Sequence, residues 1–235
     1  MAKIFTSKGE DGKHWISISD MMSGLMMVFL FIAISYMINV TKEKDKIKEI
    51  AVTYNRLQND LHDDLFSEFK DSLESWSASI DRQTLSVRFE SPEVLFSGGS
   101  YQLQDKFKVI LNDFFPRYIN ILSNDKYKND IDEIRIEGHT SSDWTTKCSP
   151  EIAYFNNMNL SQNRTRSVLE YVLTLPNLDG DKDWIRKNLT ANGLSSSKLI
   201  LNPNGDEDKF LSRRVEFRVK TNAEKRIVKI INETE

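Results

Sequence analysis

The chain has 235 residues, which is enough for one ordinary domain with an extension or for two small domains. The chain contains 32 Lys and Arg and 35 Asp and Glu, and the resulting formal net charge of −3 gives no reason to expect nucleic acid as a partner. The single cysteine, Cys148, excludes an intrachain disulfide and leaves the redox compartment open.

An apolar stretch over residues 21–40 is the first predicted element. As a helix its 20 residues span about 30 Å, one hydrocarbon thickness of a bilayer. A cleaved signal peptide is the main alternative, but the stretch exceeds the usual apolar length and no clear small-x-small cleavage site follows it. We therefore predict a short tail over residues 1–14 and one uncleaved transmembrane helix over residues 15–40.

Asp20 stands at the head of this stretch and has two interpretations. It is either a helix N-cap among lipid headgroups or an intramembrane carboxylate that marks an ion path. Ser23 and Gly24 follow at i+3 and i+4, so they share its helix face, and small residues there let other helices approach closely. This face favours ion carriage by Asp20, with Ser23 and Gly24 facing the channel. A lone helix forms no pore, so other helices must take part.

A helical linker is predicted over residues 41–80. Its apolar residues recur at spacings of 3, 4, 3 and 4, which is the seam of a short coiled coil. The seam consists of Ile47, Ile50, Tyr54, Leu57 and Leu61. Two alternatives stay open: a parallel two-stranded coiled coil that pairs two membrane helices, or an amphipathic helix packed on its own domain. More lysines follow the membrane stretch than precede it, which by the positive-inside count favours a cytoplasmic C-terminal side.

The remaining chain alternates short strands with helices over residues 81–221, followed by a tail over residues 222–235. The predicted strands are 84–90, 132–138, 189–193 and 213–220, and the predicted helices are 103–122 and 160–175. This order predicts an α/β sandwich, in which helices cover one face of a mixed sheet.

Three ordered stretches of this domain, "IRIEGHTSS", "NLSQNRTRSVLEYV" and "SRRVEFRV", resemble the OmpA-like peptidoglycan-binding module. The resemblance covers about residues 84–221 and implies a site for the diaminopimelate unit of the wall peptide. The arginine of the family pattern L-S-x-x-R contacts a charged end of that unit and carries over to Arg164, with Leu160 and Asn157 matching the same pattern. A guanidinium suits this role because it binds a carboxylate through paired hydrogen bonds.

The chain departs from the family pattern at its acidic position. The aspartate that follows His-Thr in the family is Ser141 here, so the acidic partner of the ligand's ammonium group is missing. Asp143 is the expected replacement, from a connection over residues 142–158 that is longer and more irregular than usual, and Ser141 still offers a hydrogen bond. Arg213 is assigned to the predicted site, although Arg213 and Arg214 also suit ordinary solvated or ion-paired positions. We expect weaker or altered wall binding.

The sequence gives no sign of an enzyme. His139 has no cysteine or histidine at metal-ligand spacing, so we predict no metal site. Ser141 has no visible His/Asp arrangement for nucleophilic catalysis, and no glycine-rich phosphate loop occurs. We expect no cofactor beyond a coupling ion, a proton or Na⁺.

The order of the parts resembles the B subunits of ion-driven stators, the MotB type of the flagellar motor. Within that group "DMMSGLMMVFLFIA" is closer to the ZorB family of Zorya anti-phage defence. The resemblance implies an inner-membrane protein with a cytoplasmic N-terminus and a periplasmic domain, against the positive-inside count.

The same resemblance implies the partners of the chain. Two copies would stand inside a ring of five multi-pass A subunits of MotA or ZorA type, paired through the membrane helix, the linker and the domain. The domain would bind peptidoglycan while Asp20 carries the ion. A flagellar-type stator subunit, a TolR/ExbD-like energy transducer and a passive wall anchor remain as alternatives.

Overall fold

The computed structural model describes residues 11–90, 92–144, 147–178 and 182–222. Residues 1–10 of the predicted N-terminal tail and all but the first residue of the predicted tail 222–235 lie outside this description. The chain forms two compact units that divide between Val52 and Thr53, and each is described by itself.

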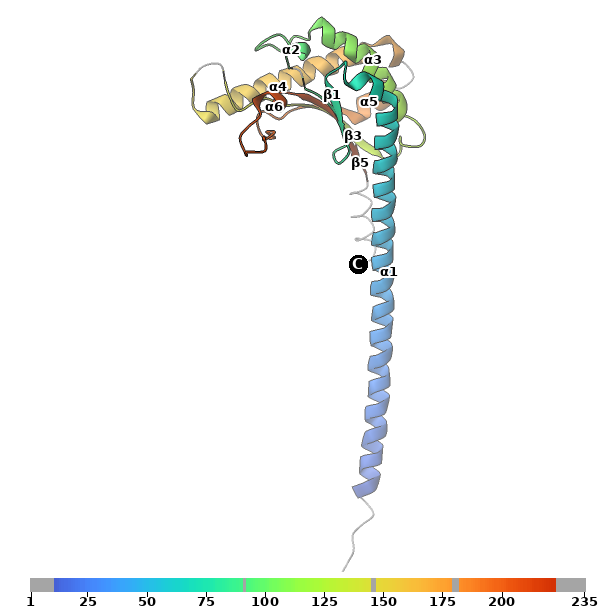
Figure 1. Cartoon of the computed structure of the whole chain (residues 1–235). Coiled ribbons are helices and arrows are strands. Elements are labelled where there is room, and N and C mark those ends of the chain that lie inside the picture. Colours follow the sequence, from blue (N-terminus) through green and yellow to red (C-terminus); the bar gives the residue numbers. More distant parts are fainter. Residues whose placement is uncertain (1–10, 91, 145–146, 179–181, 223–235) are drawn as a thin grey trace, which may run out of the picture. The chain divides into compact units, whose positions relative to one another are not determined.

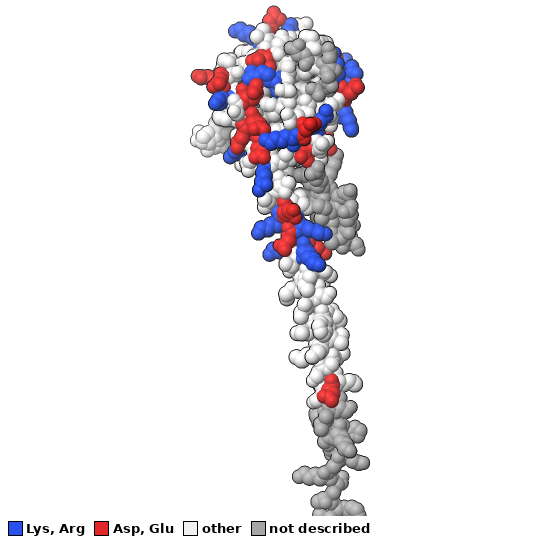
Figure 2. All heavy atoms as spheres, turned by 90° about the vertical axis from the view of Figure 1, so that its right-hand side faces the viewer, with Lys and Arg blue, Asp and Glu red and all other residues white. Residues whose placement is uncertain are grey.

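The first unit consists of the greater part of helix α1 (Asp11–Leu73), which continues without a break into the second. From Ile18 onward this helix contains an 18-residue window of mean hydropathy 2.2 in which no residue is buried. Figure 2 shows this length of helix as a mainly uncharged surface, with acidic and basic side chains gathered beyond it. By length and composition the helix is able to cross a membrane.

The second unit contains a five-stranded mixed sheet. Its strands are β1 (Ala78–Asp81), β2 (Ser86–Phe89), β3 (Ile131–Gly138), β4 (Leu189–Gly193) and β5 (Val215–Thr221). Their order in the sheet is β1-β2-β5-β3-β4, in which β3 and β4 run parallel and the other neighbours antiparallel. The predicted mixed sheet is confirmed, with β1 as a strand that the sequence pattern did not predict.

Helices complete the predicted sandwich. They are α2 (Pro92–Leu95), α3 (Asp105–Leu122), α4 (Pro150–Leu173), the 3₁₀ helix η1 (Pro176–Leu178), α5 (Lys182–Asn188) and α6 (Lys209–Ser212). Figure 1 shows α3 and α4 together on one side of the strands. The irregular connection expected over residues 142–158 is wrong for its second half, because α4 begins at Pro150. Ser149 caps this helix by accepting a hydrogen bond from the backbone of Ile152, and proline suits the first helical position.

The core lies between the sheet and these helices. Alternate strand residues such as Val87, Phe89 and Phe217 are buried, as expected where one face of a pleated strand is covered. The ring of Phe114 on α3 packs 5.2 Å from that of Phe89 and 5.0 Å from that of Phe217. The last turns of α1 belong to the same core, to which they contribute Leu61, Leu65 and Phe69.

Polar contacts also fix the end of α1 to the domain. Arg117 donates hydrogen bonds to the carboxylate and to the backbone carbonyl of Glu68, each at 2.7 Å. Lys126 contacts Asp64 at 2.8 Å, and Gln58 donates to the backbone carbonyl of Gln83 at 2.7 Å. The alternative of a helix packed on its own domain therefore describes α1 from Leu57 onward, where the seam residues join the core. Only the earlier part of the seam stays available for a coiled coil.

Candidate functional site

Two glycines let α4 lie close against the ends of β3 and β4. A Cβ atom added to Gly138 would meet the Thr165 side chain at 2.7 Å and the Ser161 carbonyl oxygen at 2.9 Å. At Gly193 it would overlap the backbone of Gln162. Gly138, which precedes His139, is thus required for close packing. It lets the turn of α4 that carries Arg164 lie against the ends of these strands.

Asn157 ties the loop after β3 to α4. Its side-chain amide donates to the backbone carbonyls of Ser141 at 3.1 Å and Asp143 at 3.0 Å, and the side chain is buried. Ser141 is buried as well. The structure therefore brings these three predicted site residues together and gives the Asn157 amide a positioning task. Their contact with a wall ligand stays a prediction.

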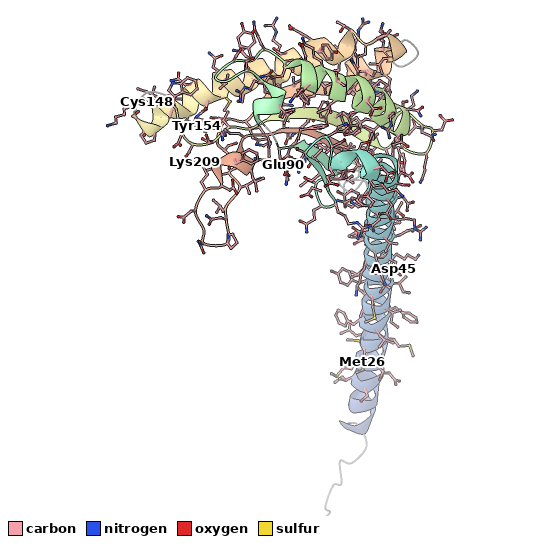
Figure 3. The ribbon with its side chains drawn as sticks, turned by 45° about the horizontal axis from the view of Figure 1, so that its top comes forward. Met26, Asp45, Glu90, Cys148, Tyr154 and Lys209 are labelled. Carbon is pink, nitrogen blue, oxygen red and sulfur yellow. The ribbon has the colours of Figure 1, made fainter. Side chains whose placement is uncertain are left out.

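The carboxylate of Asp143 lies at the edge of the same loop. It forms an ion pair with Lys209 on α6 at 2.6 Å, and its side chain is 59% exposed. The neighbouring Ser142 donates from its backbone and its hydroxyl to Glu207. Lys209 and Tyr154, from α6 and α4, lie at one end of the domain in Figure 3. Because Lys209 already compensates Asp143, its predicted replacement of the family aspartate requires a ligand that competes with this lysine.

Arg164 and Arg213 line one small pocket. Residues Leu95, Phe96, Gly138, His139, Arg214 and Val215 complete its wall. Arg164 Nε donates to the Ser100 carbonyl oxygen at 2.9 Å, and its guanidinium lies 4.8 Å from the centre of the Phe96 ring. Burial, and then the charge of Arg213, lowers the pKa of Arg164 to about 10, so Arg164 stays charged at neutral pH. No carboxylate is among the described residues that line this pocket, which suits it to an anionic group.

Leu160 lies half-buried on α4 outside that lining. The predicted membrane residues Asp20, Ser23 and Gly24 are exposed on α1, and a Cβ atom at Gly24 would meet nothing within 4 Å. The predicted ion carriage by these residues therefore requires contacts with groups of other molecules.

A buried ionic network lies beside the arginine pocket and was not predicted from the sequence. Glu137 on β3 stands opposite Glu216 on β5, and Glu216 accepts hydrogen bonds from Arg214 at 2.6 Å and Arg88 at 3.0 Å. Burial acts to raise the pKa of Glu216, but the charge and hydrogen bond of Arg214 outweigh it and lower this pKa to about 2. Burial, then the charge of Arg214, lowers the pKa of His139 to about 3.

Glu137, His139 and Glu216 place one possible metal-ligand atom each within 4.8 Å of one another. Both ring nitrogens of His139 are buried and have no hydrogen-bond partner among the described residues. However, Arg214 and Arg88 already hold Glu216. A divalent cation here would lie among like charges at short range, which is costly in a buried place. This chemistry favours an ion-pair network, and the absence of a metal stays a prediction.

The buried network carried a sequence signal of its own. Glutamate occupies the polar positions of "RIEG" and "VEFRV", in strands whose alternate residues are apolar, with arginines nearby in both stretches. The Phe96–Ser100 segment that holds Arg164 carried no comparable signal, because its contact spans 64 positions of the chain.

No protein-family model matches the chain. Among curated proteins it is similar to the Zorya protein ZorB of Escherichia coli, with 53% identity over 233 residues that cover 99% of this chain and 98% of that protein. Among solved structures it is similar to a MotB-like protein from Desulfovibrio vulgaris, with a TM-score of 0.47, 24% identity, and coverage of 74% of this chain and 94% of that one. The periplasmic domain of Helicobacter pylori MotB gives a TM-score of 0.44 at 18% identity, covering 66% of this chain and 89% of that one.

Proposed function

Because the chain belongs to the ZorB family of Zorya proteins, we propose that it is the stator-like B subunit of an ion-driven membrane motor in anti-phage defence. The observation that supports this most directly is helix α1. It carries an exposed apolar stretch headed by Asp20 and ends inside the core of a domain with an arginine-lined pocket. A membrane-crossing length and an anchoring domain are the two parts that such a subunit needs.

Asp20 is the ion carrier in this proposal. Two copies of the chain stand inside a ring of five multi-pass A subunits, and each presents Asp20, Ser23 and Gly24 to that ring. Protonation removes the charge of the carboxylate and changes its contact with the ring, and release of the proton restores both. A contact with two states of this kind drives stepwise movement when a proton gradient biases the order of the steps. A Na⁺ ion would act through the same carboxylate.

The domain is the anchor. It lies in the periplasm, with the N-terminus of the chain in the cytoplasm, and holds the B subunits still by binding peptidoglycan. Arg164 and Arg213 receive a carboxylate of the peptide stem, because the described lining of their pocket contains no carboxylate and Glu216 beside it is bonded to Arg214 and Arg88. With Ser141 at the family's acidic position, recognition depends more on this carboxylate than on the ligand's ammonium group.

Replacement of Asp20 tests the proposal against a passive wall anchor. Asp20→Asn keeps a good helix cap but removes the titrating group, so we expect it to reduce phage protection to the level of cells without the system. Plating efficiency of phage measures this. Asp45→Asn, an exposed aspartate further along the same helix, is the matched control and should protect like the wild type. Full protection by Asp20→Asn, at wild-type levels of membrane insertion, would refute ion carriage.

A further inference from the structure

An open groove of about 550 Å³ lies on the helical side of the domain, and its lining shares no residue with that of the arginine pocket. The loop before α3 contributes Tyr101 and Gln102, α3 contributes Lys108, and α4 contributes Ser167, Glu170 and Tyr171. Two tyrosines and several uncharged polar groups thus line a shallow surface groove with room for a small organic ligand.

Tyr101 is the unusual member of this groove. Its side chain is 53% exposed, although a tyrosine ring carries a large apolar face. Tyr171 is held in place, because its hydroxyl donates to the side chain of Asn112 at 2.8 Å. Lys108 is neutralised by Asp105 at 2.9 Å. Glu170 forms an ion pair with Arg166 at 2.8 Å. The groove is therefore lined by two aromatic side chains and uncharged hydrogen-bonding groups, and its charged side chains are paired.

A saccharide ring matches this chemistry. Its C–H face packs on an aromatic ring, while its hydroxyl and acetamido groups form hydrogen bonds with polar side chains at the rim. The side chains of Gln102 and Ser167 supply such partners. A free carboxylate or phosphate would find no comparable positive charge here, in contrast to the arginine pocket.

The groove adjoins the arginine pocket through one loop and one helix. Ser100 accepts the hydrogen bond of Arg164, and the next residue, Tyr101, lines the groove. On α4, Arg164, Ser167 and Tyr171 follow one another at spacings of three and four, so they share a helix face. From Arg164 to Tyr171 the helix rises about 10 Å, roughly the length of a disaccharide.

We propose that this groove binds the saccharide of the wall polymer, an N-acetylhexosamine of the glycan strand, while the arginine pocket holds the peptide stem of the same unit. The proposal rests on the proposed wall-binding function and adds a second subsite to it. The domain would then recognise a joined sugar and peptide rather than the peptide alone.

Calorimetric titration of the detergent-solubilised full chain tests this with three probes: a free diaminopimelate tetrapeptide, the corresponding disaccharide tetrapeptide, and an N-acetylglucosamine tetramer. We expect the disaccharide tetrapeptide to bind about tenfold more tightly than the free peptide, the effect of one good aromatic contact. Tyr101→Ala should abolish that tenfold gain and leave binding of the free peptide unchanged. Arg164→Ala should weaken both peptides.

Two control variants separate the ring from general surface effects. Tyr101→Phe should retain the gain, because it keeps the aromatic face, and Val109→Ala, another exposed residue near the start of α3, should behave like the wild type. Equal binding of both peptides by the wild type, or equal weakening of both by Tyr101→Ala, would overturn the saccharide subsite. If neither peptide binds, the proposed wall-binding function is refuted, and the N-acetylglucosamine tetramer then tests the saccharide subsite alone. Tetramer binding that Tyr101→Ala abolishes would support this subsite, and no tetramer binding would refute it.

Discussion

The apolar stretch of α1 and the domain after Thr53 differ in how far their aromatic side chains are exposed. Phe29 in the stretch is 61% exposed, whereas Phe89, Phe114 and Phe217 in the domain are fully buried. Their carboxylates differ in parallel: Asp20 is exposed, while Glu216 is buried and bonded to Arg214 and Arg88. These four side chains of the domain thus find their partners within the chain. The apolar side chains and the carboxylate of the stretch are exposed instead, as expected of a segment that lies within lipid and beside other subunits.

The largest effect on the free energy of unfolding is expected from a core phenylalanine, in contrast to one in the apolar stretch. Phe114→Ala removes a ring at the centre of the core and should lower the free energy of unfolding of the domain by about 3–5 kcal/mol. Phe29→Ala should leave that quantity unchanged, because its ring contributes nothing to this core. Urea unfolding of the full chain in detergent measures both. Comparable destabilisation by the two variants would contradict the comparison.

A loss of similar or slightly smaller size is expected from breaking the buried ion pair. Arg214→Met leaves Glu216 buried with Arg88 alone and should destabilise the domain by about 3–5 kcal/mol. The double variant Arg214→Met, Glu216→Leu should recover much of that loss, because Glu216 is then no longer a buried carboxylate that has lost its Arg214 partner. The same urea unfolding curves report it. A double variant less stable than the single one would mean that the pair itself, rather than compensation of the buried charge, stabilises the domain.

A smaller effect is expected from pH. Burial lowers the pKa of His139 from the ordinary 6.5 to about 3 in the folded protein. Below pH 6.5 the unfolded chain therefore binds a proton at this side chain that the folded chain does not bind. The free energy of unfolding should therefore fall as pH drops from 6.5, by at most about 1.4 kcal/mol per pH unit. Measurements between about pH 5.5 and 6.5 lie above the range in which Glu216 titrates. His139→Gln should flatten the slope there, and an unchanged slope would assign it to other groups.

The smallest effect on the domain is expected from the seam of α1. Ile47→Ala should change unfolding by less than about 0.5 kcal/mol, because Ile47 is exposed, whereas Leu61→Ala should cost about 2–5 kcal/mol. If residues 47–54 form a dimer seam, Ile47→Ala should still reduce chemical cross-linking between two copies in membranes. Unfolding as strongly affected by Ile47→Ala as by Leu61→Ala would place both residues in one core.

Strands and helices with a clear period were predictable from the sequence. The limits of β3, β4 and α3 lie at or within two residues of the predicted ones. In α3 the buried residues recur at the helical spacing, and in β3 Ile134, Ile136 and Gly138 alternate with less buried or polar neighbours. β1 was missed, since its four residues are all half-buried and give no alternation. The first turns of α4 read as loop because asparagines such as Asn156 and Asn157 favour turns in isolation, and here burial of Ala153 and Asn157 outweighs that preference.

The candidate site was predictable only where one motif carries it. Arg164 follows from its motif, and it lines one pocket with Arg213, while the contact of either arginine with a wall ligand stays a prediction. The ion pair between Asp143 and Lys209 joins residues 66 positions apart, and the opposition of Glu137 and Glu216 depends on strand register. Neither is visible until the sheet is assembled, because pairings between distant segments follow from topology rather than from local pattern.

The burial of Leu61, Leu65 and Phe69 in the domain core decides where the chain tolerates a cut. A soluble fragment that starts at residue 81 lacks all three side chains and the Glu68 partner of Arg117, and it leaves the Phe114 ring open to water. Such a fragment should aggregate, whereas one that starts at Thr53 keeps the whole core. Proteolytic cleavage ahead of Thr53 would therefore release a folded domain, and cleavage between Leu61 and Phe69 would unfold it.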